Sequence, residues 1–181
     1  MSLTIVPFDA AISREHFQSG SIPLDRYIRE QASQDIRRRV SACFMALNSQ
    51  RQLLAYYTLA SASVLLDQLP SAIQKKLPRY AAVPAVRMGR LAVDQGHRHK
   101  GLGSALLADA LSRACRSEIT AFTLIVDAKD QEAIQFYRHH GFISLSNNGQ
   151  SLFLPLASAS GLVHSKKVGS SWHSLPSPRA N

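Results

Sequence analysis

The order of the expected elements predicts an α+β fold built around a mixed sheet. Two strand patterns joined by a short polar turn, Val40–Asn48 and Leu53–Ser61, indicate an antiparallel pair. A strand, helix and strand then follow between residues 86 and 126, which is the order of a parallel crossover. A late pair of short strands closes the domain, so antiparallel and parallel pairing occur in one sheet.

The remaining elements follow from hydrophobic spacing and turn residues. We expect further strands at Leu3–Phe8, Val86–Val93, Phe122–Val126, Phe142–Leu145 and Leu152–Leu156, the last two joined by a turn at Asn147-Asn148-Gly149. The expected helices are Leu24–Gln34, Leu102–Arg116 and Gln131–His140, with a short candidate at Ala11–Phe17. The segment from Pro70 to Tyr80 is expected to be irregular or briefly helical.

Composition divides the chain at about residue 156. Residues 157–181 contain seven Ser, two Pro, three Lys or Arg and no acidic residue. A polar, low-complexity segment buries too little apolar surface to offset the entropy of ordering it. We therefore expect one folded domain at 1–156 and a basic, Ser-rich, disordered tail at 157–181.

The net charge indicates which kinds of partner to expect. With 21 Lys and Arg against 12 Asp and Glu, the chain carries +9, which favours an anionic partner or a solvated basic surface. No apolar run reaches the ~18 residues that a membrane span needs, and the N-terminus lacks a signal-peptide pattern, so we expect a cytoplasmic protein without a membrane partner. Two cysteines and scattered histidines indicate no metal site.

One segment, Leu91–Ser104, has the pattern of a phosphate cradle. The strand end Leu91–Val93 runs into a basic, Gly-containing loop that opens the helix starting near Leu102. A helix start offers unpaired backbone N–H groups and the positive end of the helix dipole. Glycine lets a ligand approach the backbone because it has no Cβ. The alternative is a simple turn with close helix packing.

Together with a second segment, the cradle resembles the motifs of a known protein family. The pattern Arg98-x-x-Gly101-x-Gly103, followed some thirty residues later by Asp130 to Phe142, resembles the acetyl-CoA motifs of the GNAT N-acetyltransferase superfamily. The similarity extends to the GNAT toxins of bacterial type II toxin–antitoxin systems and covers about residues 3–156. It is carried by Tyr56–Leu59, Leu77–Tyr80, Gly89–Asp94, Val126–Asp130 and Leu152–Pro155.

The resemblance implies a GNAT fold, in which helices flank a mostly antiparallel mixed sheet and acetyl-CoA binds where the two central parallel strands splay. It implies acetyl transfer to the α-amino group of an aminoacyl-tRNA, which blocks translation. It also implies a ribbon-helix-helix antitoxin, a homodimer, and DNA contact only through the antitoxin complex. The alternatives are a GNAT enzyme acting on a protein N-terminus or a small amine, and a DNA-binding or regulatory protein without the chemistry.

The resemblance also assigns residues. Tyr137 takes the place of the acid that protonates the departing CoA thiolate, which suits a phenol with a pKa near 10. Asp130 stands where many GNAT enzymes have Asn. The expected acetyl-CoA-binding residues are Leu91, Ala92, Val93, Arg98, His99, Lys100, Gly101, Leu102, Gly103, Ser104, Asp130 and Phe136.

The acceptor side is less specified. A free α-amino group has a pKa of about 7.7–8, and an adjacent ester lowers it, so much of the amine of an aminoacyl-tRNA is already neutral at pH 7. No strong general base is therefore required, although Asp94 and Glu132 remain candidates. Contacts to tRNA mainly follow phosphates and shape. The basic residues expected to make them are Arg37, Arg38, Arg39, Lys75, Lys76, Arg79, Arg87 and Arg90.

Overall fold

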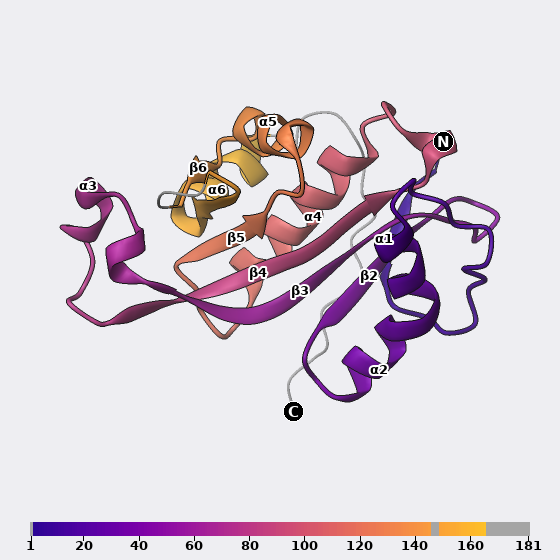
Figure 1. Ribbon diagram of the computed structural model, residues 1–181, viewed down its shortest axis with the longest axis horizontal. Coiled ribbons are helices and arrows are strands. Elements are labelled where there is room, and N and C mark those ends of the chain that lie inside the picture. Colours follow the sequence, from indigo (N-terminus) through magenta and orange to yellow (C-terminus); the bar gives the residue numbers. More distant parts are fainter. Residues whose placement is uncertain (1, 146–148, 166–181) are drawn as a thin grey trace.

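The computed structural model describes residues 2–145 and 149–165, and the side chains up to residue 160 (Figure 1). Its centre is a seven-stranded sheet with the order β1-β2-β3-β4-β5-β7-β6. Only β4 and β5 pair in parallel. The predicted α+β fold with a mixed, mostly antiparallel sheet is confirmed. The strands are β1 Thr4–Pro7, β2 Ala42–Leu47, β3 Leu53–Leu65, β4 Ala82–Val93, β5 Thr123–Asp127, β6 Ile143–Ser144 and β7 Ser151–Pro155.

The main predicted helices are present, with differences at Leu24–Gln34 and Ala11–Phe17. The predicted helix at Leu24–Gln34 is longer and irregular: α1 Ile22–Arg26 and α2 Ala32–Arg37 are joined by a π-helical stretch, Tyr27–Gln31. The predicted short helix at Ala11–Phe17 is absent, and that segment forms turns instead. The others are α3 Ser71–Gln74, α4 Leu102–Arg116, α5 Gln131–His139 and α6 Leu156–Ser165, with 3-10 turns at Leu66–Gln68 and Gln95–His97.

Helix α6 corrects the predicted domain boundary. Residues 157–165 were expected to begin a disordered tail, but they continue from β7 as a helix that packs against α4. Leu156 and Ala159 are buried there, which gives this short helix a tertiary reason to form. Most of the expected turn at 147–149 and the rest of the expected tail, 166–181, lie outside the described residues.

The two faces of the sheet bury different cores. On one face, α4 and α5 pack on Tyr57, Leu124 and their neighbours. On the other face, α1 and α2 cover Tyr56, whereas Val64 belongs to a separate cluster near α3. Because alternate residues of a strand share a face, Tyr56 and Val64 lie on the same side of β3. That face therefore carries two separate cores at different points along β3.

A β-bulge opens the sheet at its centre. In the β3–β4 pairing, Thr58 faces Arg90 and Leu59 faces Met88, so Gly89 is an extra residue in β4. The β4–β5 pairing ends at Met88 and Val126. Beyond that pair, β4 continues to Val93 with no partner on its β5 side. The expected splay of the two parallel strands is confirmed.

In the described ranges, 2–145 and 149–165, no helix combines the length and the apolar character needed to cross a bilayer.

Candidate active site

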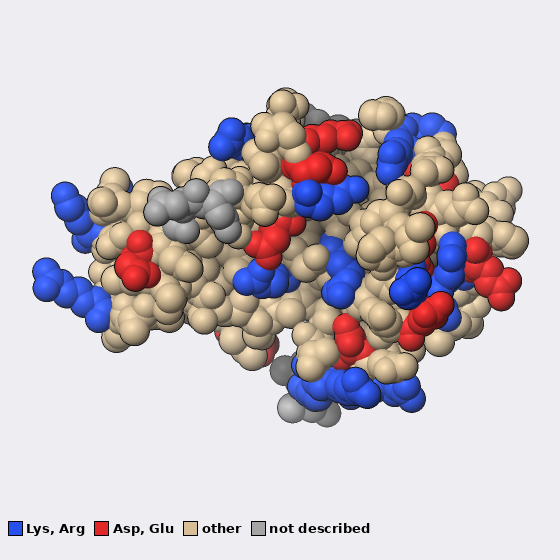
Figure 2. Space-filling view, viewed as in Figure 1, with Lys and Arg blue, Asp and Glu red and all other residues tan. Residues whose placement is uncertain are grey.

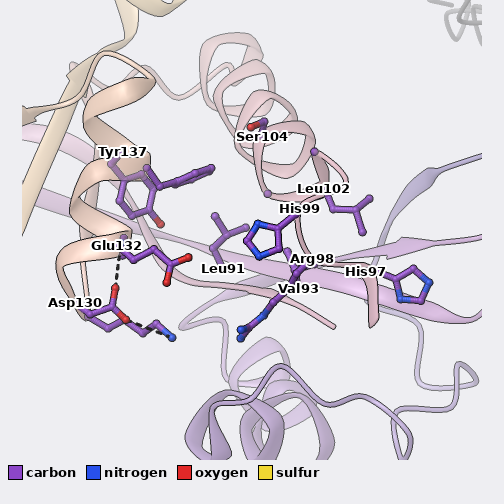
Figure 3. Close-up of a pocket in the computed structure, with 15 residues that line it drawn as sticks. Leu91, Val93, His97, Arg98, His99, Leu102, Ser104, Asp130, Glu132 and Tyr137 are labelled. Carbon is purple, nitrogen blue, oxygen red and sulfur yellow. Dashed lines mark hydrogen bonds and ion pairs between the residues drawn. The ribbon is translucent and has the colours of Figure 1, made fainter. Parts of the chain in front are cut away.

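A cavity of about 380 Å³ lies at the splay, between the end of β4, the loop before α4 and the first turns of α5 (Figure 3). It collects most of the residues expected to bind acetyl-CoA from segments that are far apart in the chain. Those that line it are Leu91, Val93, Arg98, His99, Gly101, Leu102, Gly103, Ser104, Asp130, Phe136 and Tyr137. Of the predicted set, Ala92 and Lys100 do not line it.

The strand end presents backbone to the cavity. Leu91 and Val93 line it, whereas Ala92 is buried on the opposite face beside Tyr56. This alternation is the ordinary consequence of strand geometry. Ala92 can therefore contribute backbone alone, and its side chain belongs to the core under α1 and α2.

The start of α4 forms the other wall. The backbone of His99 and of Gly101 has positive φ, +59° and +79°, and this turns the chain sharply into the helix. A Cβ built on Gly101 would meet no atom within 4 Å, so the space in front of the first helical amides is open. The amides of the first turn have no partner within the helix. Open space before unpaired N–H groups suits a pyrophosphate.

Gly103 lies beside the neighbouring helix α5. A Cβ at this position would lie 3.5 Å from two atoms of the Phe136 ring, which is ordinary van der Waals contact. The two helices are therefore close together here, but their packing alone does not require a glycine. The predicted contact of Gly103 with the ligand stays a prediction.

The two basic side chains of the loop donate hydrogen bonds to backbone carbonyl oxygens. Arg98 lines the cavity, but its guanidinium donates to the carbonyl oxygen of Ser19, in the connector before α1. Lys100 donates from Nζ to the carbonyl oxygen of Gly96 at 3.0 Å. These contacts hold both side chains against backbone carbonyl oxygens, and their predicted place near the pyrophosphate stays a prediction. Both still add positive charge to the loop.

Asp130 caps helix α5. Its Oδ1 accepts a hydrogen bond from the backbone N–H of Ala133 at 2.8 Å, and its Oδ2 lies 3.8 Å from Nζ of Lys129. The carboxylate thereby satisfies one of the unpaired donors at the helix start. The cap also orients the helix that carries Phe136 and Tyr137.

We expect Asp130→Ala to lower the free energy of unfolding by about 1 kcal/mol, because the cap is lost. Asp130→Asn should keep most of that stability, since an amide oxygen caps equally well. Chemical denaturation of both variants measures the difference. Equal stability of the alanine and asparagine variants would contradict the capping role.

His140 joins the two cavity helices, and the sequence did not indicate this role. Its Nδ1 lies 2.8 Å from the carbonyl oxygen of Phe136, and its Nε2 lies 3.0 Å from Oγ of Ser104. A carbonyl can only accept, so Nδ1 carries a proton, and Nε2 is hydrogen-bonded to the Ser104 hydroxyl. The hydroxyl of Ser104 is thus engaged, and its backbone N–H is the group left for a ligand.

Tyr137 is buried at the inner end of the cavity, with 7% of its surface exposed. Its ring packs against Phe136 and Phe142 at centroid distances of 5.2 and 5.3 Å. Among the described residues, its hydroxyl makes a weak contact with Sδ of Met88, at 4.0 Å. Burial, and secondarily the charge of Asp127, raises the pKa of Tyr137 above its usual value. The phenol is therefore protonated at neutral pH.

Known proteins share this arrangement. A model of the acetyltransferase (GNAT) domain matches residues 65–144. A tRNA-acetylating toxin of Mycobacterium tuberculosis is 33% identical over 149 residues, which cover 81% of this chain and 88% of that protein. This chain belongs to the GNAT acetyltransferase family. Its similarity to that relative places it in the toxin branch, and it is an acetyl-CoA-dependent N-acetyltransferase.

Solved GNAT structures agree with this placement. The structure of AtaT complexed with acetyl-methionyl-tRNAfMet has a TM-score of 0.83 and 30% identity, and covers 89% of this chain and 99% of its own. A Tyr-to-Phe mutant of the AtaT toxin bound to the C-terminus of the antitoxin AtaR and to acetyl-CoA has a TM-score of 0.76 and 26% identity. That structure covers 91% of this chain and 99% of its own.

Further cavity residues in this GNAT chain fell outside the expected cofactor set: His97, Lys129, Glu132 and Ala133. Glu132 was a candidate base, and Figure 3 shows its carboxylate directed into the cavity near Tyr137. Asp94, the other candidate, instead bonds the amides of Gln18 and Gly96. No group of three potential metal ligands occurs in the part of the chain that the structure describes.

The basic residues expected to contact tRNA do not form one patch. Figure 2 shows Lys and Arg side chains at the far α3 end and at the α2 end, with mixed charges between them. Lys75, Lys76 and Arg79 belong to the first group, and Arg37, Arg38 and Arg39 to the second. Arg87 and Arg90 lie between, on the central strand β4: Arg87 pairs with Asp127, and the Arg90 guanidinium stacks 3.6 Å from the Tyr27 ring centroid.

Proposed function

We propose that this protein transfers the acetyl group of acetyl-CoA to the α-amino group of an aminoacyl-tRNA. The acetylated residue cannot be extended into peptide, so translation stops. The observation that carries the proposal is the cavity at the point where β4 leaves β5, which brings the buried Tyr137 together with the first residues of α4. The likeness to a tRNA-acetylating toxin supports the acceptor.

Different residues around the cavity would bind different parts of the cofactor. The amides of Leu102, Gly103 and Ser104 would hold the pyrophosphate, aided by the positive end of the α4 dipole. The unpaired edge of β4 from Leu91 to Val93 would pair with the pantetheine amides as another strand would. These contacts set the thioester beside Tyr137, whose proton would go to the departing thiolate.

Acceptor binding would draw on the two basic ends of the molecule. Because a tRNA is much larger than the cavity, its backbone can reach surfaces on either side of the splay. Phosphate contacts of this kind give affinity without sequence readout and weaken with salt. A small amine would need neither surface.

We expect replacement of Arg37, Arg38 and Arg39 by Gln, or of Lys75, Lys76 and Arg79 by Gln, to raise the KM for aminoacyl-tRNA. Each lost contact should flatten the dependence of log affinity on log salt by about 0.7–0.9. The two triple variants remove equal charge from opposite ends, so each is the control for the other. The KM for acetyl-CoA should stay unchanged in both. An unaltered salt dependence in both would remove these residues from the tRNA surface.

The proposal is tested by supplying labelled acetyl-CoA with separate pools of charged and uncharged tRNA, a peptide with a free N-terminus and a set of small amines. We expect label on charged tRNA only, and its release with the amino acid when the ester is hydrolysed. Label on the peptide or the amines, with none on charged tRNA, would establish the alternative acceptors instead.

Partners follow from the same proposal. A toxin of this kind needs an inhibitor, and we propose a ribbon-helix-helix antitoxin that also supplies the only contact with DNA. We propose that the toxin is a homodimer acting in the cytoplasm, where charged tRNA is consumed. The structure of AtaT with the C-terminus of the antitoxin AtaR supports an antitoxin partner.

A further inference from the structure

The carboxylate of Asp127 lies where β4 and β5 separate, on the side away from the cofactor cavity. Asp127 ends β5, one residue after Val126, which is the last residue paired with β4. The side chain of Val126 belongs to the core under α4 and α5. Since successive side chains of a strand point to opposite faces, Asp127 points to the other face.

Two contacts fix this carboxylate. Its Oδ2 forms an ion pair with Arg87 on β4, and its Oδ1 accepts a hydrogen bond from Oγ of Ser151 on β7 at 2.7 Å. The side chain is nevertheless 54% exposed. It lines a hollow of about 150 Å³ together with Arg87 and Ser151. Asp127 is thus held in place and open to an incoming group.

The acceptor must arrive on this side. Tyr137 and the cradle lie on the face that α4 and α5 cover, and acetyl-CoA would fill that cavity. An amine that does not compete with the cofactor reaches the thioester through the gap between β4 and β5, from the opposite face. Asp127 stands at that gap, and its charge reaches Tyr137, whose pKa it helps to raise.

The negative charge of Asp127 is complementary to the charge of the arriving amine. The arriving α-amino group of an aminoacyl ester is partly an ammonium ion at neutral pH. Arg87 and Arg90 on β4 would repel that cation while attracting phosphate. Asp127 is the anion paired with Arg87 on this face. Among the described residues, the titratable groups around it are Arg87 on β4, Lys129 two residues along the chain and, across the gap, Tyr137 on α5. The polar residues that line the same hollow are Ser63, Gln68 and Ser151.

We propose that Asp127 binds the α-ammonium group of the acceptor and removes its proton. This role rests on the proposed function. The ammonium gives one proton to the carboxylate, and the neutral amine attacks the acetyl carbon. The new C–N bond forms as the C–S bond breaks, and the thiolate takes the proton of Tyr137. The exposed carboxylate passes the first proton to solvent and then accepts the second amine proton, and the Tyr137 phenolate regains a proton from solvent, so the step needs no other reactant.

The test is the pH dependence of kcat/KM for aminoacyl-tRNA in Asp127→Asn, an isosteric change. At about pH 6, where the amine is mostly protonated, the variant should be about 100-fold slower than the wild type. Near pH 9 solvent alone supplies the neutral amine, so the deficit should shrink to less than about tenfold. A role in structure alone would give a deficit that does not change with pH.

Arg87→Gln is the matched control, because it breaks the same ion pair and keeps the carboxylate. It should raise the KM for tRNA and leave the shape of the pH profile unchanged. Equal losses at every pH in both variants would overturn the proposal and reduce Asp127 to an ion-pair partner. Circular dichroism and acetyl-CoA binding verify the fold. Should Asp127→Asn not fold, Asp127→Glu against Asp127→Gln gives the same comparison, with the glutamate variant expected to keep the low-pH rate.

The wild-type assay separates this proposal from the one it rests on. If the wild-type protein places no label on charged tRNA, the proposed function itself fails. If the wild type acetylates charged tRNA and the Asp127→Asn deficit is constant with pH, only the role of Asp127 fails.

Discussion

Tyr137→Phe is expected to lower kcat for acetyl transfer by about 100- to 1,000-fold, the size of a general-acid contribution. The hydroxyl is the proton donor nearest the expected place of the thioester, and the change removes that atom alone. Its one described contact, the long approach to Met88, is too weak to stabilise the fold measurably. The melting temperature and the affinity for acetyl-CoA should therefore stay near those of the wild type.

The pH dependence supplies an independent check on Tyr137. Burial raises the pKa of this phenol, so the acid form persists through the neutral range and is lost only as pH rises past that raised pKa. We expect no alkaline loss of kcat from this group below about pH 10. A phenylalanine variant with full kcat would remove Tyr137 from the chemistry, and one that no longer binds acetyl-CoA would indicate a role in shaping the cavity.

The limits of helices α4 and α5 were predicted to within one residue, because local sequence patterns set them. Helix α4 begins and ends at the expected residues, Leu102 and Arg116, because its apolar residues repeat at helical spacing over four turns. Helix α5 differs by one residue, since Asp130 and Gly141 mark its two ends. The cradle followed from the same kind of signal, a strand, glycines and a helix start in sequence.

Contacts between segments that are far apart in the chain could not be predicted from the sequence. Arg98 has the charge for a phosphate, but only the fold brings the Ser19 carbonyl to its guanidinium. The acceptor face likewise arises from register, since no local pattern marks Gly89 as the bulge that opens β4 from β5. Helix α6 was missed because composition averaged over 157–181 hides a short segment whose helical form depends on packing against α4.

Exchanging Gly101 for Asp is the second change with a large expected effect, and Gly101→Asn is its neutral counterpart. Both side chains tolerate the positive φ of this position better than other residues do, and open space receives either one. The pair therefore differs in one charge at the entrance of the cradle. If the first amides of α4 hold the pyrophosphate, the aspartate variant should bind acetyl-CoA about 10- to 100-fold more weakly than the asparagine variant.

The stability of the unliganded protein should change in the opposite direction to its affinity for acetyl-CoA. The two variants therefore separate repulsion of the ligand from damage to the fold. A carboxylate at the start of α4 interacts favourably with the helix dipole, so the unliganded aspartate variant should be at least as stable as the asparagine variant. Weaker binding by an equally stable protein can then only come from repulsion of an anionic ligand. The difference in affinity should also shrink as salt screens that repulsion. Equal affinity of the two variants for acetyl-CoA, by isothermal titration at low salt, would place the pyrophosphate elsewhere.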